Sequence, residues 1–107
     1  MAILVKFQMS SCGTCGMMAK FDSKVASEEG VDFEVCKVTD VDDYVRYRDV
    51  LLLAHPDLEN VGYPLYVLVD AVEPEDETEP TMIGSIRGGM DKGRFRTKLK
   101  TLTQFLD

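Results

Sequence analysis

The spacing of apolar residues changes along the chain, and each change marks the boundary of an expected element. Residues 2–8, AILVKFQ, form a short apolar run with β-branched side chains, which is typical of a buried strand. From Thr14 the apolar positions recur in steps of three and four up to Gly30, which predicts a helix with Asp22 outside its apolar stripe. The alternation in residues 31–38 predicts a second strand whose far end is buried on both faces. Together these segments predict a β-α-β unit.

A second helix and a central strand are expected next. Asp40 and the acidic residues after it are candidate caps for a helix that ends near His55, because Pro56 disfavours helical geometry at the residue before it. The segment 64–72 begins on Pro64, and proline is tolerated at the first position of a strand but not within a central one. We therefore expect a buried strand that starts at this proline.

The last part of the chain predicts a hairpin and a final helix. Residues 81–88 have the pattern of a fourth strand, which we expect to pair with the third across the acidic loop 73–80. Gly88 and Gly89 interrupt the chain, and Asp91 is a candidate cap for a helix with one apolar stripe. That stripe consists of Phe95, Leu99, Leu102 and Leu106. The element order is β-α-β-α-β-β-α, which indicates an α/β fold.

Length, charge and cysteine content narrow the function classes. With 107 residues, 45% of them hydrophobic, the chain can bury one core but not two, so we expect a single domain over residues 1–107 and a monomer. A formal net charge of −7 argues against nucleic acid as a partner, since phosphate binding needs a basic face. The first residues do not have the pattern of a signal peptide or a membrane span, and three cysteines are too few for a disulfide-stapled secreted scaffold. We expect a cytoplasmic protein that does not bind membranes.

Two of the three cysteines stand three positions apart, where the first strand is expected to turn into the first helix. Cys12 would lie beside unpaired backbone N–H groups and the positive end of the helix dipole, and both favour a thiolate. Gly13 and Thr14 place Cys15 one helical turn further in, close enough for a disulfide but shielded from solvent. The spacing predicts a redox pair in which Cys12 is the nucleophile and Cys15 the resolving thiol.

Two other interpretations of this pair stay open. A C-x-x-C can be half of a zinc site, but only Cys36 and His55 remain as further ligands, and their expected positions do not form a second zinc knuckle. No metal site is therefore assigned. The pair is also compatible with a purely structural role, and Cys36 itself has the sequence context of a small buried hydrophobic residue.

With the dithiol at a strand-to-helix corner and a later proline that opens a strand, the chain resembles the thioredoxin superfamily over nearly its whole length. AILVKFQMSSCGTC aligns without a gap on the thioredoxin pattern of apolar strand, short loop and C-G-x-C. The resemblance implies a four-stranded mixed sheet flanked by helices and a cis peptide bond before Pro64. It also implies that the backbone of Tyr63 is exposed for pairing with an extended substrate segment.

GSIRGGMDKGRF, residues 84–95, is similar to the end of a glutaredoxin. There a Gly-Gly pair and an acidic helix start hold the γ-glutamyl end of glutathione, which would make Gly88, Gly89 and Asp91 substrate-binding residues. Thioredoxins also carry a glycine and a helix cap at this point, so a turn with a cap is an equal alternative. The site residues that the resemblance adds toward substrate are Gly13, Thr14, Tyr63, Pro64, Gly88, Gly89 and Asp91.

Three positions depart from the thioredoxin pattern. Ser11 replaces a tryptophan, Thr14 replaces the proline between the cysteines, and Lys6 stands where thioredoxins have a buried carboxylate. If Lys6 points inward, its charge would lower the pKa of nearby thiols. If it points outward, it is a solvated lysine, and the sequence leaves both orientations open.

The resemblance implies a thiol–disulfide oxidoreductase that reduces protein disulfides through a mixed disulfide. It needs no bound cofactor beyond its redox-active disulfide. Its reductant would be a thioredoxin-reductase-like flavoprotein or glutathione, the latter as a co-substrate. A non-catalytic binding module of the same fold and a metal-binding protein are the alternatives.

Overall fold

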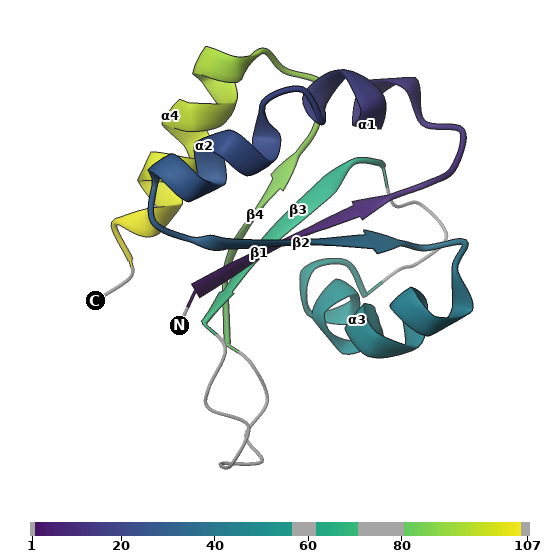
Figure 1. Cartoon of the computed structure of the whole chain (residues 1–107). Coiled ribbons are helices and arrows are strands. Elements are labelled where there is room, and N and C mark those ends of the chain that lie inside the picture. Colours follow the sequence, from purple (N-terminus) through teal and green to yellow (C-terminus); the bar gives the residue numbers. More distant parts are fainter. Residues whose placement is uncertain (1, 57–61, 71–80, 106–107) are drawn as a thin grey trace.

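The computed structural model describes residues 2–56, 62–70 and 81–105. Its eight elements follow one another in an α/β order (Figure 1). They are β1 (Ala2–Gln8), α1 (Gly13–Met18), α2 (Asp22–Glu28), β2 (Asp32–Lys37), α3 (Val41–Ala54), β3 (Leu65–Asp70), β4 (Thr81–Arg87) and α4 (Lys92–Thr103).

The strands of the described residues form one four-stranded mixed sheet in the order β2-β1-β3-β4. β1 pairs in parallel with β2 and antiparallel with β3, and β3 pairs antiparallel with β4. The predicted mixed sheet and the predicted hairpin of the last two strands are therefore confirmed. The loop expected at 73–80 and Leu106, expected in the last apolar stripe, lie outside the described residues.

Helices cover both faces of the sheet: α1, α2 and α4 lie on one face and α3 on the other (Figure 1). β1 serves both sides because successive side chains of a strand point in opposite directions. Leu4 packs into a core with α1, α2 and α4, whereas Val5 and Phe7 pack into a second core with α3. The face of the sheet covered by α1, α2 and α4 is called the dithiol face, and the face covered by α3 is called the α3 face.

The helix predicted from Thr14 to Gly30 is wrong as one piece, because the structure breaks it into α1 and α2. Lys20 and Phe21 donate their amides to the carbonyls three residues earlier, and Phe21 has a φ of −140°, outside the helical range. The break turns Asp22 into the protein interior, where its exposed fraction is 2%. Its expected place outside the apolar stripe is therefore also wrong.

The expectation that the far end of the second strand is buried on both faces is wrong. β2 is an edge strand of the sheet, so Val35 and Lys37 are exposed there and only Cys36 is fully buried. The helix caps, in contrast, are confirmed. The carboxylates of Asp40 and Asp91 accept the amides of Asp43 and Arg94, which are the third residues of α3 and α4.

Candidate active site

Cys12 caps the first helix of the chain. The strand β1 ends at Gln8, and after a short turn Cys12 adopts an extended backbone as the N-cap of α1. Its Sγ accepts the backbone N–H of Cys15 at 3.0 Å and is bonded to Cys15 Sγ in a disulfide with a Cα–Cα distance of 5.2 Å. A donor aimed at Cys12 Sγ also stabilises a thiolate there once the disulfide is reduced.

The two sulfurs differ in their access to solvent. Cys12 is partly exposed, whereas Cys15 lies in the core of the molecule with an exposed fraction of 3%. Molecules in solution can therefore reach Cys12 more readily than Cys15, and the predicted shielding of Cys15 is confirmed. Gly13 is exposed and Thr14 partly exposed between them, and their role toward substrate stays a prediction.

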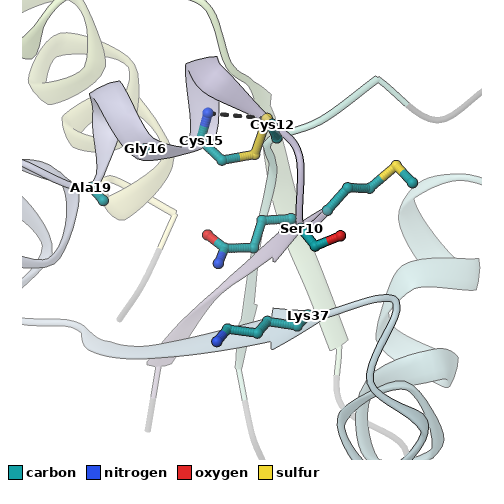
Figure 2. Close-up of a pocket in the computed structure, with 8 residues that line it drawn as sticks. Ser10, Cys12, Cys15, Gly16, Ala19 and Lys37 are labelled. Carbon is teal, nitrogen blue, oxygen red and sulfur yellow. Dashed lines mark hydrogen bonds between the residues drawn. A yellow bond between two sulfur atoms is a disulfide. The ribbon is translucent and has the colours of Figure 1, made fainter.

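A pocket of about 320 Å³ opens beside the disulfide. The segment 9–12 between β1 and α1 is called the dithiol loop. The pocket is lined by Ser10 and Cys12 of this loop, by Cys15 and Gly16 of α1 and by Lys37 of β2 (Figure 2). Met9 also lines it, and Met9 and Met17, which flank the two cysteines in the sequence, are 41% and 45% exposed. The surroundings of Cys12 thus offer flexible apolar contacts and one ammonium group at the pocket wall.

Pro64 follows a cis peptide bond at Tyr63, as the resemblance implied. It directly precedes β3, whose first residue Leu65 pairs with Phe7 near the end of β1. The proline therefore lies at the end of the sheet where β1 leads into the loop before Cys12. Pro64 is buried and Tyr63 partly exposed. Pairing of a substrate segment with the backbone of Tyr63 stays a prediction.

Gly88 and Gly89 connect this end of the sheet to α1. Gly88 donates its amide to the carbonyl of Pro64 at 2.8 Å, and a Cβ at Gly88 would collide with the Pro64 ring. Gly89, at a φ of +99°, donates its amide to the sulfur of Met18 at 3.4 Å. Both glycines have packing reasons to be there, and binding of a γ-glutamyl group by them and by Asp91 stays a prediction.

A buried ion pair lies beneath the disulfide. Lys6 points inward, to the dithiol face, where its Nζ donates to the carbonyl of Cys15 at 2.9 Å and to Asp22 Oδ2 at 2.6 Å. The hydroxyl of Tyr66 on β3 donates to the same Asp22 oxygen at 2.8 Å. Burial, reinforced by the Asp22 carboxylate, raises the pKa of Tyr66 far above its usual value, so this hydroxyl remains a donor.

Sequence reasoning missed Asp22 and Tyr66 as members of the site. Asp22 stands four positions after Met18 and three before Val25, which are both core residues, so a charged residue occupied the apolar stripe of the helix. Lys6 likewise interrupts an otherwise apolar strand. Two opposite charges inside two apolar stripes were a signal for a buried pair.

Cys36 belongs to the α3 face and is fully buried. Its Sγ donates weakly to the carbonyl of Asp43 at 3.5 Å. Burial, together with the carboxylates of Asp43 and Asp40, raises the pKa of this thiol to about 11. The sequence interpretation of Cys36 as a small buried hydrophobic residue fits this environment.

Structural comparison identifies the fold. No model of a known protein family and no curated protein sequence matches the chain. Among solved structures, the thioredoxin of Trichomonas vaginalis aligns at a TM-score of 0.61 and 17% identity, over 94% of this chain and 78% of that one. Mitochondrial thioredoxin 3 of Saccharomyces cerevisiae in its oxidised form aligns at 0.58 and 22%, over 98% and 78%. A thioredoxin from Thermus thermophilus aligns at 0.61 and 19%, over 96% and 72%. The chain has a thioredoxin-like fold.

Two properties of the described residues concern membrane-spanning helices and metal sites. None of the described helices combines the length and the hydropathy that a transmembrane segment requires. Within the same residues, no three side chains of His, Cys, Asp or Glu gather as the ligands of a metal ion would.

Proposed function

We propose that the chain is a thiol–disulfide oxidoreductase that reduces protein disulfides with the Cys12–Cys15 dithiol. One observation carries the proposal: a disulfide at the start of α1 joins a partly exposed sulfur that accepts a helix amide to a buried sulfur. Such an arrangement gives the two thiols different roles, because the thiol that attacks a client must be accessible from outside, whereas a resolving thiol can be buried if it lies within reach of the first sulfur.

The reaction transfers two electrons from the dithiol to the client disulfide. The thiolate of Cys12 attacks one client sulfur, the other client sulfur leaves as a thiolate and takes up a proton, and a mixed disulfide forms. Cys15 loses its proton and attacks Cys12 Sγ, which releases the second client thiol. The client is then fully reduced, and the chain holds the disulfide seen in the structure.

The client surface would be the dithiol loop with its neighbours. Met9 and Met17 offer adaptable apolar contacts around Cys12. The backbone of Tyr63, before the cis bond to Pro64, would pair with an extended client segment, as in the family that the chain resembles. The regeneration of the dithiol would need a flavoprotein reductase or glutathione, in a reducing compartment such as the cytoplasm.

An insulin-reduction assay with dithiothreitol as electron source tests the function. The wild-type chain should accelerate insulin precipitation, and Cys12→Ser should fall to the uncatalysed rate. Cys15→Ser that is reduced beforehand and freed of dithiothreitol should accumulate a covalent adduct with insulin. Cys36→Ala is the matched control and should retain the wild-type rate. Activity that survives in Cys12→Ser would contradict the proposal.

Further measurements on the wild-type chain separate the rival functions and identify the reductant. A binding module would bind unfolded peptides equally in both redox states without accelerating reduction. A metal protein would carry stoichiometric zinc after purification. The reductant is identified by supplying either glutathione with glutathione reductase or a thioredoxin reductase with NADPH, and by measuring which system reduces the Cys12–Cys15 disulfide.

A further inference from the structure

The carbonyl of Cys15 contacts a buried cation. The Lys6 side chain rises from β1 with an exposed fraction of 1%, and its Nζ reaches the Cys15 carbonyl, which also accepts the helix amide of Ala19 at 3.0 Å. An ammonium excluded from water acts on neighbouring groups through a low effective dielectric, so its charge influences Cys15 far more than a surface charge would.

Asp22 is held away from the role of a base for Cys15. Its Oδ2 accepts Lys6 and Tyr66, and its Oδ1 accepts the amide of Ser23 at 2.6 Å. The described bonds therefore commit both oxygens of Asp22 to other donors. Of the two charges, the ammonium is the one that contacts Cys15 directly.

The other titratable groups around Cys15 are few. Cys12 shares the disulfide, Tyr66 stays protonated at the far side of Asp22, and Lys37 lines the same pocket from β2, where it is exposed. Solvent screens Lys37, and Cys12 can be removed by mutation. The stability of a Cys15 thiolate thus depends on the balance between the attraction of the Lys6 ammonium and the repulsion of the Asp22 carboxylate.

We propose that Lys6 is a positioning residue whose buried ammonium stabilises the thiolate of Cys15 and so promotes the resolving step. The inference rests on the proposed function for that step. Thioredoxins, which the chain resembles, have a carboxylate at the position of Lys6, so the charge there has the opposite sign in this chain. A buried cation at this position favours the ionised form of the resolving thiol through its charge. The proton of Cys15 leaves to solvent before the attack, and Lys6 takes no part in the proton transfer.

The decisive experiment removes both charges at once. In a Cys12→Ser background, the Cβ resonance of carbon-13-labelled Cys15 is titrated by NMR with and without the neutral pair Lys6→Met/Asp22→Asn. If the cation dominates, loss of the pair raises the pKa of Cys15. If the carboxylate dominates, the pKa falls, and if the pair serves only to brace β1 against α2, the pKa does not move. Either of the last two outcomes would overturn the proposal.

The kinetics of resolution give a second signature. A mixed disulfide between Cys12 and a thionitrobenzoate group is formed at acidic pH, where Cys15 is protonated, and release of the group after a jump to each higher pH is followed by stopped-flow absorbance. A midpoint about one pH unit higher cuts the thiolate population at pH 7 tenfold and raises its nucleophilicity about threefold, so release should slow about threefold. At alkaline pH, where Cys15 is ionised in the wild type and in the neutral variant, the neutral variant should be the faster one, and a structural brace would not produce such a crossover.

Glu28→Gln/Arg96→Met is the matched control. It removes one positive and one negative charge, as the neutral pair does, but from a solvent-accessible ion pair between α2 and α4. Its pH profile should overlay that of the wild type. A shift equal to that of the neutral pair would show that the loss of any ion pair has this effect, and it would overturn the assignment to Lys6.

A measurement on the unmutated pair protects the test if the variants do not fold. Burial alone raises the pKa of a thiol, so a Cys15 without cationic support should titrate above free cysteine. With Lys6 in place, Cys15 in the Cys12→Ser protein should titrate at or below free cysteine, and a higher value overturns the proposal. Because this titration needs no turnover, it stands even if the insulin assay shows that the chain is not a reductase.

Discussion

The two faces of the sheet use the same strands for different purposes. On the dithiol face, β1 and β3 contribute Lys6 and Tyr66, which form a buried polar cluster with Asp22. On the α3 face the same strands contribute Phe7 and Val67, which pack into a core of apolar side chains. The cysteine of each face follows its surroundings: the pair at α1 forms a disulfide, whereas Cys36 remains a free thiol.

The difference teaches that the chemistry of a cysteine depends on the polar and charged groups around it. A helix amide meets Cys12 Sγ, and an ammonium meets the Cys15 carbonyl. Cys36 instead meets apolar side chains and carboxylates, which disfavour its thiolate. The α3 face therefore serves as an internal reference for the dithiol face.

The largest effect is expected when one half of the buried ion pair is removed. Lys6→Ala leaves the carboxylate of Asp22 in the interior without its cation, which should lower the free energy of unfolding by about 3–5 kcal/mol. The double variant Lys6→Met/Asp22→Leu, which fills the space with apolar groups, should recover most of that loss. Urea unfolding of the reduced proteins measures both, and equal stabilities of the single and double variants would show that the pair is not coupled.

A comparable loss without any change in thiol chemistry is expected on the α3 face. Leu51 is 1% exposed, and Leu51→Ala should cost about 3 kcal/mol through lost burial and a cavity. Because the cavity lies across the sheet from α1, the pH dependence of Cys12 alkylation should match that of the wild type. A shifted alkylation profile would mean that the two faces are not independent.

An intermediate effect should come from the pKa of Cys36. The folded thiol has a pKa of about 11 against 9.0 for an unperturbed thiol, so the native state holds this proton more tightly than the unfolded state. The resulting stability is complete below pH 9 and is lost as the pH rises toward 11, with a slope that approaches about 1.4 kcal/mol per pH unit. In urea titrations at several pH values, Cys36→Ala should lack this part of the alkaline decline.

The smallest effect concerns the start of α4. Asp91→Ala removes the acceptor for the Arg94 amide and should cost about 1 kcal/mol. If Asp91 acts only as a cap, the KM for glutathione in the coupled assay should not change. A raised KM with an unchanged kcat would instead support the glutaredoxin-like role of Asp91. Thermal unfolding and steady-state kinetics on the same variant separate the two.

Local sequence patterns were sufficient for much of this architecture. The apolar run of residues 2–8, the proline at the start of the third strand and the acidic caps of two helices are signals that act within a few residues. The dithiol position followed from the same local logic. Helix starts and strand runs are therefore the part of the fold that the sequence predicts best.

Features that depend on distant partners were not predictable in the same way. The break before Asp22 places its carboxylate against Lys6 and Tyr66, 16 and 44 residues away in sequence. Strand order is equally non-local, since nothing in residues 31–38 tells whether β2 lies at an edge. The inward orientation of Lys6 likewise depends on a counter-ion in another element, Asp22 of α2.

The burial of Cys36 across the sheet from α1 has a consequence for the proposed function. If Cys12 forms a mixed disulfide with a client, Cys15 is the one thiol of the described chain placed to attack it from within the molecule, because Cys36 faces α3 and is closed to solvent. Under that proposal, intramolecular exchange would regenerate the Cys12–Cys15 disulfide and would form no disulfide to Cys36.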